Sequence, residues 1–224
     1  MTIKWSYLGL THYEKVLRLQ QELRDQVQNG AAVDYLLLLS HHPVVTRGVS
    51  ERNDDGLIEP RERFVQENIP IFDIDRGGKT TYHGPDQLVG YLIFDLKRRQ
   101  FKPRQFVEKV AEVIVTVLDS YGIDAHYDED DPGIVVDHKK IGFLGFSIQK
   151  NVTMHGFGLN VGRDLKPFEY IVPCGKVGRT ITSMEDETGR AYSLYDVYWR
   201  IVTAFGGIFA DNLEEVFVDA HSQV

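Results

Sequence analysis

The residue of this chain best suited to nucleophilic chemistry is its single cysteine, Cys174. It lies between Pro173 and Gly175, and the cations Lys176 and Arg179 follow closely. Nearby cations stabilise a thiolate, which is the reactive form of cysteine. A free cysteine is also a common filler of protein cores, where the thiol is inert. The local sequence therefore leaves two roles open, a nucleophile or a small buried hydrophobe.

A lysine at the start of an apolar stretch is the second candidate. Lys140 directly precedes Ile141-Gly142-Phe143-Leu144-Gly145, a glycine-containing segment with strand character. Burial lowers the pKa of a lysine, and a neutral amine is a competent base. Most lysines are solvated, so an ordinary surface lysine remains the alternative for this segment taken alone.

The densest polar motif is RGGKTTYHGP, which runs from Arg76 to Pro85. Adjacent glycines let a backbone approach a ligand closely and present N–H groups to an anion or a carbonyl. Charged, hydroxyl and imidazole side chains follow them directly, between two apolar strand candidates. This concentration favours a binding site on a loop, and a hairpin with a polar rim is the alternative.

Several common site signatures are missing. The sequence has no GxxxxGK[ST] phosphate loop and no GxSxG elbow, and GFGLNVG at 156–162 misses GxGxxG by one residue. His41 and His42 are adjacent and would point to opposite faces of a strand, and the lone cysteine lacks zinc spacing. The acidic run at 128–131 lacks the alternation of a calcium loop. We therefore expect no metal and no cofactor.

Composition narrows the class of protein. A chain of 224 residues that is 42% hydrophobic and 26% charged fits a soluble globular protein. The formal charge of −8 argues against a general nucleic-acid binder. The first residues lack the apolar region of a secretory signal, and no apolar run is long enough to cross a bilayer. With one cysteine, these features predict a cytoplasmic protein that binds neither nucleic acid nor membrane.

Charge is unevenly distributed along the chain. A basic run comprises Lys97, Arg98, Arg99, Lys102 and Arg104, and an acidic run covers residues 128–131. Such runs are ordinarily solvated loops or helix ends. The sharper interpretation of the basic run is a docking surface for an acidic protein, because complementary charges steer encounter.

The hydrophobic pattern predicts one α/β domain with a mixed sheet and helices packed outside it. Strands are expected at residues 3–9, 34–40, 69–74, 88–96, 133–137, 141–149 and 152–161. A hairpin turn at Gln149-Lys150-Asn151 would join the last two strands. A polar loop is expected between Pro43 and about residue 60.

Three long helices are expected. The first covers residues 12–28, and Thr11 to Glu14 match a capping box at its start. The second begins at Pro103 and ends before Gly122, with an apolar face made of Phe106, Val110, Val113, Ile114 and Leu118. The third begins after Ser193 and runs through about Phe205.

Three of these segments occur together in the order and spacing of a known family. They resemble the octanoyltransferases of lipoate biosynthesis. The segments are RGGKTTYHGPDQ at 76–87, KIGFLG at 140–145, and PCG at 173–175 with the later pair Thr182-Ser183. His42 to Gly48 resembles the histidine-proline segment of that family, and Asp131 to Val136 resembles its Pro-Gly-Val-Trp strand. The resemblance extends from about residue 5 to about residue 210.

The resemblance implies a fold shared with biotin and lipoate protein ligases, with a largely antiparallel sheet and a single catalytic domain over residues 1–224. It implies that octanoyl moves from octanoyl-acyl carrier protein to a lysine of a lipoyl domain, the first step of endogenous lipoate synthesis. The acceptors would be the lipoyl domains of 2-oxoacid dehydrogenase E2 subunits and the glycine cleavage H protein. No cofactor is implied.

By motif, the resemblance makes Cys174 the residue that accepts the acyl group as a thioester and Lys140 the residue that activates it. The substrate-binding residues that carry over are Arg76, Gly77, Gly78, Lys79, Thr80, Thr81, Tyr82, His83, Phe143, Leu144, Gly145, Gly156, Phe157 and Gly158. The chain departs from the family pattern at Asp86, Val135, Lys176 and Met184. Lys176 and Lys139 are rival cations for the role of Lys140.

The chemistry adds further expectations. A slot lined by Phe143, Leu144 and Phe157 would stabilise an eight-carbon chain by on the order of 5 kcal/mol, at about 0.8 kcal/mol per methylene. Backbone N–H groups near Gly145 and Cys174 and in the Gly77-Gly78 loop are candidates for binding the tetrahedral oxyanion. We expect the acidic carrier protein to dock on the basic run.

Three alternatives remain. An ATP-dependent lipoate or biotin ligase would share the fold but would need no cysteine. An amidotransferase that moves octanoyl from one lipoyl domain to another would use the same thiol. A non-catalytic carrier-protein binder would need neither Cys174 nor Lys140.

Overall fold

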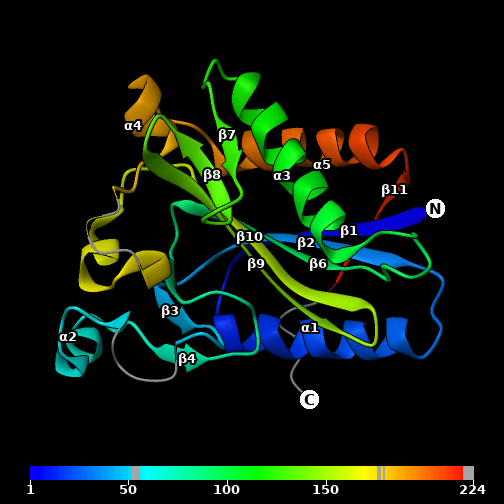
Figure 1. Ribbon diagram of the computed structural model, residues 1–224, viewed down its shortest axis with the longest axis horizontal. Coiled ribbons are helices and arrows are strands. Elements are labelled where there is room, and N and C mark those ends of the chain that lie inside the picture. Colours follow the sequence, from blue (N-terminus) through cyan, green and yellow to red (C-terminus); the bar gives the residue numbers. More distant parts are fainter. Residues whose placement is uncertain (52–55, 176–177, 179, 219–224) are drawn as a thin grey trace.

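The computed structural model (Figure 1) describes residues 1–51, 56–175, 178 and 180–218. Its centre is an eight-stranded sheet with the order β11-β1-β2-β6-β10-β9-β8-β7, and a three-stranded sheet with the order β4-β3-β5 lies beside it. The large sheet contains β1 (Thr2–Thr11), β2 (Asp34–His41), β6 (Gln87–Ile93), β7 (His126–Asp128), β8 (Gly133–Val136), β9 (Lys139–Gln149), β10 (Val152–Asn160) and β11 (Asn212–Glu215). The small sheet contains β3 (Val44–Arg47), β4 (Ile71–Asp73) and β5 (Thr80–His83).

Most strand pairs are antiparallel. Only β1 with β2, β1 with β11, and β3 with β4 are parallel among the named pairs of the described residues. The predicted fold class, a mixed and largely antiparallel sheet with helices outside, is confirmed.

The long helices cover both faces of the large sheet (Figure 1). Helix α1 (Tyr13–Gln28) packs on one face, whereas α3 (Pro103–Asp119) and α5 (Leu194–Phe209) pack on the other. Shorter helical segments are α2 (Arg61–Gln66), α4 (Met184–Thr188), η2 (Lys166–Tyr170) and η3 (Pro173–Gly175). No helix of the described residues combines the length and the apolar character needed to span a bilayer.

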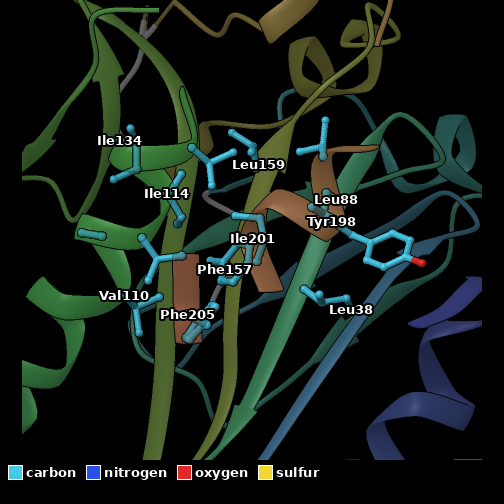
Figure 2. Packing of buried hydrophobic residues seen from close by; sticks show 14 of the residues in the cluster. Leu38, Leu88, Val110, Ile114, Ile134, Phe157, Leu159, Tyr198, Ile201 and Phe205 are labelled. Carbon is cyan, nitrogen blue, oxygen red and sulfur yellow. The ribbon is translucent and has the colours of Figure 1, made fainter. Parts of the chain in front are cut away.

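The larger hydrophobic core fills the space between the sheet and the helix pair α3 and α5. Figure 2 shows Val110 and Ile114 of α3 and Phe205 of α5 pointing toward Phe157 and Leu159 of β10. The predicted apolar face of α3 is confirmed, because Phe106, Val110, Val113, Ile114 and Leu118 are all buried. A second core lies between α1 and the opposite face of the sheet.

The predicted hairpin between β9 and β10 is confirmed. Lys150 (φ 49°) and Asn151 (φ 66°) both adopt the left-handed conformation that a tight hairpin turn requires. This hairpin places Gly145 of β9 directly opposite Gly156 of β10, and Phe143 opposite Gly158. Three glycines and an aromatic ring therefore share one patch of the sheet.

Two local predictions were wrong. The expected capping box at Thr11–Glu14 does not form, because His12 is the N-cap and no side chain accepts a hydrogen bond there. The expected loop after Pro43 contains β3, and the glycine-rich motif contains β5. Both strands have four residues, too short for alternation to be read, and each depends on the other as its antiparallel partner.

The basic run is partly used inside the fold. Arg98 and Arg99 bind the two carboxylate oxygens of Asp34, each at 2.5 Å, and Arg99 also pairs with Asp211. Asp34 is fully buried. The docking surface predicted for this run therefore narrows to its exposed members, Lys97, Lys102 and Arg104.

Candidate active site

A cavity of about 560 Å³ lies between the large sheet and the small sheet. Its volume falls within the range of sites for small ligands, about 300 to 1,000 Å³. Of the residues predicted to bind substrate, the cavity is lined by Arg76, Gly77, Gly78, Lys79, Thr80, Thr81, His83, Phe143, Leu144, Gly145, Gly156, Phe157 and Gly158. The structure thus brings three separate sequence stretches to one place. Their binding of substrate stays a prediction.

Tyr82 does not line this cavity. Side chains alternate along a strand, so Thr81 and His83 of β5 face the cavity and Tyr82 faces the other way. The Tyr82 ring packs edge-on against Phe168, with a centroid distance of 5.5 Å. Its place is in a small core beneath β5.

The glycines allow the glycine-rich loop to lie directly on the large sheet. The Gly77 N–H donates a hydrogen bond of 2.9 Å to the carbonyl of Phe146. A Cβ atom at Gly145 would lie 3.2 Å from both Arg76 Cδ and the Gly77 oxygen. The close approach that the sequence predicted toward a ligand is here an approach of one backbone to another. Because the Gly77 N–H is occupied, it is not free to bind an oxyanion.

Arg76 anchors the same loop to the small sheet. Its guanidinium donates to the Thr46 carbonyl at 2.8 Å, to the Thr46 hydroxyl at 3.0 Å and to the Gly77 carbonyl at 3.0 Å. The residue is only 8% exposed. Arg76 therefore carries a buried positive charge at the wall of the cavity.

Lys140 is fully buried and forms an ion pair. Its Nζ lies 3.1 Å from Asp131 Oδ1 and donates to the Asp131 carbonyl at 3.3 Å. Gly133 provides the space, since a Cβ atom there would collide with the Lys140 side chain. A turn presents Asp131, because the backbone N–H groups of Asp130 and Asp131 both donate to Asp128 Oδ1.

Sequence reasoning missed Asp131. It belongs to the acidic run that the pattern assigned to a solvated surface, yet it is 6% exposed and lines the cavity. The available signal was its position directly before the Pro-Gly pair that opens β8. Asp131 is therefore the ion-pair partner of the lysine that sequence reasoning singled out.

Residues that follow Cys174 in the sequence, Thr180 and Thr182, lie beside Lys140. The Lys140 N–H donates to the Thr180 carbonyl at 2.9 Å, and the Thr182 N–H donates to the Lys140 carbonyl at 3.0 Å. The backbone of Cys174 belongs to η3, whereas its side chain and the residues Lys176 and Arg179 lie outside what the structure describes. The Cys174–Lys140 dyad therefore stays a prediction.

Two other lysines near this segment have distinct settings. Lys139 pairs with Glu187 of α4 at 2.5 Å, so its amine is held away from the role predicted for Lys140. Lys79 packs on the backbone of Gly175, where an added Cβ atom would collide with the end of the lysine side chain. Lys79 therefore brings a second amine close to η3.

A chain of hydrogen-bonded side chains joins the site to the turn at Thr182-Ser183, which we call the Thr-Ser turn. Asn160 Nδ2 donates to the Thr182 carbonyl at 2.9 Å, and Gln87 Nε2 donates to Asn160 Oδ1 at 2.8 Å and to the Tyr82 carbonyl at 3.3 Å. Because carbonyls only accept, Gln87 must turn its own oxygen to His83 Nδ1, at 2.6 Å. We call these three residues, His83, Gln87 and Asn160, the amide chain.

The direction of the amide chain fixes the state of His83. Its Nδ1 carries the hydrogen that Gln87 accepts, so Nε2 is left as an acceptor. Burial lowers the pKa of His83 to about 3, so the ring is neutral at physiological pH. Asn160 was not predicted as a site residue, because its partners lie on β6 and in the Thr-Ser turn, far away in sequence.

Among the described residues, no group of three or more histidine, cysteine, aspartate or glutamate side chains is arranged to hold a metal ion. The side chains that line the cavity offer an amine, guanidinium groups, imidazoles, hydroxyls and the Asp131 carboxylate.

Comparisons with known proteins identify relatives over nearly the whole chain. Residues 12–206 match the family described as lipoyl protein ligase A/B catalytic domain. An octanoyltransferase of Alkaliphilus metalliredigens is 36% identical over 209 residues, which cover 93% of this chain and 95% of that protein. An octanoyltransferase of Dictyoglomus turgidum is 41% identical over 205 residues, covering 92% of this chain and 86% of that protein.

Solved structures support the fold. Lipoate-protein ligase A bound with ATP superposes with a TM-score of 0.82 at 16% identity, over 98% of this chain and 90% of that chain. A bipartite lipoate protein ligase from Thermoplasma acidophilum, described with its E2 lipoyl domain, gives a TM-score of 0.76 at 14% identity, over 98% and 88% of the two chains. At such identities the likeness concerns the fold alone.

Proposed function

This chain belongs to the lipoyl protein ligase A/B catalytic-domain family and is an octanoyltransferase of lipoate biosynthesis, and we propose that it moves octanoyl through a thioester on Cys174. The donor is octanoyl-acyl carrier protein, and the acceptor is a lysine of a lipoyl domain, in E2 subunits or the glycine cleavage H protein. The observation that carries the proposal is the buried Lys140–Asp131 ion pair, together with the backbone hydrogen bonds that join Lys140 to Thr180 and Thr182, which follow Cys174 in the sequence.

In the first half-reaction, the Cys174 thiolate attacks the thioester carbonyl of the carrier. A new C–S bond to Cys174 forms, the old C–S bond breaks, and the carrier leaves as a thiolate. The Lys140 ammonium has two roles here. Its charge stabilises the attacking thiolate, and it can then donate a proton to the departing sulfur, which leaves Lys140 as a neutral amine.

The second half-reaction uses the proton that Lys140 has given up. The lysine of the lipoyl domain loses one proton to solvent and attacks the acyl-cysteine as a neutral amine. Neutral Lys140 takes the second proton as the amide bond forms, and Cys174 leaves as a thiolate. The ammonium and the thiolate are then restored together. This closed exchange explains why a lysine with a carboxylate partner suits the site, since each half-reaction returns what the other removed.

The apolar part of the cavity suits the acyl chain. Phe143, Leu144 and Phe157 line it, as the sequence predicted for an octanoyl slot. Burial of the methylenes and the methyl of an octanoyl chain there would contribute on the order of 5 kcal/mol of binding. With the Gly77 N–H committed to Phe146, the backbone N–H groups near Gly145, Cys174 and Gly78 remain the candidates for binding the oxyanion. We place the activity in a single domain over residues 1–224, working in the cytoplasm.

Intact-mass spectrometry tests the thioester. After mixing with octanoyl-carrier protein, and with no ATP present, the protein should gain the mass of one octanoyl group, and mapping should place it on Cys174. Adding lipoyl domain should then remove the adduct and acylate the domain. Cys174→Ala should give neither product. Lys140→Ala should transfer octanoyl much more slowly than the wild type. Its matched control is Lys139→Ala, which removes a neighbouring amine that pairs with Glu187 instead.

The same experiment separates the alternatives. Full activity of Cys174→Ala with free octanoate and ATP would show a ligase and refute the thioester. Octanoylated lipoyl domain that serves as a better donor than the carrier protein would show an amidotransferase. Absence of any transfer with either donor would leave only carrier binding.

A further inference from the structure

One part of the cavity carries polar side chains that the proposed reaction does not use. Tyr13 of α1, Tyr91 of β6 and His155 of β10 line it, and we call these three residues the end wall. His155 pairs with Phe146 on β9. Lys140 Nζ lies 5.6 Å from the centre of the Phe143 ring, and from Phe143 to Phe146 the strand advances roughly 10 Å, at about 3.3 Å per residue. The end wall is therefore within reach of an extended medium-length acyl chain that begins near the amine that we assign to catalysis.

Tyr91 offers the cavity an acceptor. His41 Nδ1 lies 3.1 Å from the Thr11 carbonyl, which only accepts, so this nitrogen carries the hydrogen. The other ring nitrogen, Nε2, must then accept from the Tyr91 hydroxyl, at 2.7 Å. Burial lowers the pKa of His41 to about 4 and raises the pKa of Tyr91 well above its ordinary value, so both groups stay neutral. The remaining lone pairs of the Tyr91 oxygen are unused by this bond.

His155 is held in an unusual conformation. Its φ of 64° lies in the left-handed region that residues other than glycine rarely adopt. Its N–H donates to Gln20 Oε1 at 2.9 Å, and its Nε2 lies 2.8 Å from Asp75 Oδ1. The hydrogen bond from His155 holds the pKa of Asp75 below its usual range, so the carboxylate accepts and Nε2 carries the hydrogen. Such backbone strain is maintained only where surrounding contacts enforce it.

Tyr13 offers the cavity a hydroxyl without a partner. The residue is 4% exposed, and its ring packs against His41 and Phe72 at centroid distances of 5.3 and 5.2 Å. Its hydroxyl has no hydrogen-bond partner among the described residues, although the side chain lines the cavity. A buried hydroxyl is ordinarily paired, which indicates that a water molecule or a ligand completes this one.

We propose that the end wall determines which acyl chains the enzyme accepts, by the polarity of the wall as well as its position. A methyl-ended chain that stops within the apolar stretch is accepted. A longer methyl-ended chain would cover the hydroxyl of Tyr13 and the oxygen of Tyr91 without giving either a partner, and this is unfavourable. A longer chain that ends in a hydroxyl can donate to Tyr91 and accept from Tyr13. The inference rests on the proposed function, because it requires an acyl chain in this cavity.

The test compares chain lengths in variants that keep the shape of the wall. Transfer rates, as kcat/KM, are measured with octanoyl-, decanoyl- and 10-hydroxydecanoyl-carrier protein for the wild type, Tyr13→Phe and Tyr91→Phe. Removing the unpaired hydroxyl of Tyr13, or the hydroxyl of Tyr91 with its unused lone pairs, should raise the decanoyl-to-octanoyl ratio by about tenfold in each variant. The matched control is Tyr35→Phe, which removes a buried hydroxyl from the same face of the sheet, outside the cavity. Its ratio should equal that of the wild type.

The hydroxylated substrate gives a second, opposite readout. The wild type should prefer 10-hydroxydecanoyl to decanoyl, and both end-wall variants should reverse that preference. Ratios that stay within twofold of wild type in both variants would overturn the inference, as would an equal change in Tyr35→Phe. If octanoyl-carrier protein never acylates Cys174, the proposed function fails. If the adduct forms and the ratios do not respond, only the end wall is refuted.

Discussion

Two buried ion pairs in this molecule have opposite settings. Asp34 binds Arg98 and Arg99 and also accepts from the Asp95 N–H at 2.9 Å, so β2, the segment after β6 and, through Asp211, the start of β11 are tied together. Asp131 binds Lys140 at the wall of a cavity, beside the segment of Cys174. The guanidinium groups of Arg98 and Arg99 bind carboxylates that hold separate segments together. Lys140 carries a compact ammonium group on a flexible side chain, and such a group can exchange a proton. Burial of a charge therefore does not by itself mark a site; the cavity and the proton chemistry do.

The largest expected effect is on the rate in Lys140→Ala. Loss of the proton donor and acceptor should lower kcat/KM for octanoyl transfer by about 10²- to 10⁴-fold. Activity assays on protein shown to be folded by circular dichroism check this. Lys139→Ala should retain activity within about threefold, because its amine is bound to Glu187. Equal losses in the two variants would show that the pairing with Asp131 has no special role.

Arg99→Ala should have the opposite effect to Lys140→Ala, with a loss of stability and no loss of activity. The side chain is 4% exposed, and its removal leaves Asp34 and Asp211 short of a partner. We expect the free energy of unfolding to fall by about 3 to 5 kcal/mol, whereas the folded enzyme should keep its kcat/KM. Urea unfolding and activity assays at low temperature measure the two quantities. A stable variant with low activity would contradict the structural role assigned to this cluster.

Buried neutral histidines give a third case, with a definite pH dependence. Burial holds the pKa of His41 at about 4 and that of His83 at about 3 in the folded state. Both values are below the unfolded value of about 6.5. The unfolded chain therefore binds more protons as the pH falls, and stability that is fully present above about pH 6.5 is lost toward pH 4.

Between pH 6.5 and pH 5 each of these histidines should cost about 2 kcal/mol of stability. Urea unfolding curves at several pH values provide the measurement. His41→Gln keeps hydrogen-bonding capacity and should show a shallower slope than the wild type. A free energy of unfolding that is flat across this interval would mean that these rings are hydrated.

The smallest effect is expected from Asp131→Asn, which keeps the shape of the partner and removes its charge. Lys140 would lose the charged partner that holds its amine in place, and we expect kcat/KM to fall by about tenfold. Asp131→Glu should restore part of the activity if charge is what matters. An Asn variant as active as the wild type would mean that the charge of Asp131 has no role in catalysis.

The elements that sequence reasoning placed correctly are those with a long local pattern. Helix α3 shows its apolar face over 17 residues, and the β9–β10 hairpin has a turn signal between two apolar runs. Most residues carried over from the family motifs reach one cavity for the same reason, because each motif lies on or beside such an element. The motifs predicted which segments come together, but not which way each side chain points. Tyr82 belongs to the glycine-rich motif, yet its side chain faces away from the cavity.

The contacts that sequence reasoning missed join distant segments. Arg99 and Asp34 are 65 positions apart, and His41 and Tyr91 are 50 apart. No periodicity links such pairs, because the sheet order that brings them together is a property of the whole chain. Asp131 is near Lys140 in sequence, yet its burial follows from the Asp128 turn, which a run of acidic residues does not reveal.

The amide chain has a consequence for what substitutions this site can tolerate. Its bonds all run one way, from the Thr182 and Tyr82 carbonyls through Asn160 and Gln87 to the imidazole. Gln87→Glu would match the original side chain atom for atom in size, and still it would remove the donor that Asn160 and Tyr82 require. The main-chain carbonyls of Thr182 and Tyr82, which can only accept, thus determine the tautomer of His83 through the side chains of Asn160 and Gln87. A substitution in the amide chain is therefore tolerated only if it keeps the order of donors and acceptors. Keeping the size and shape of the side chain is not enough.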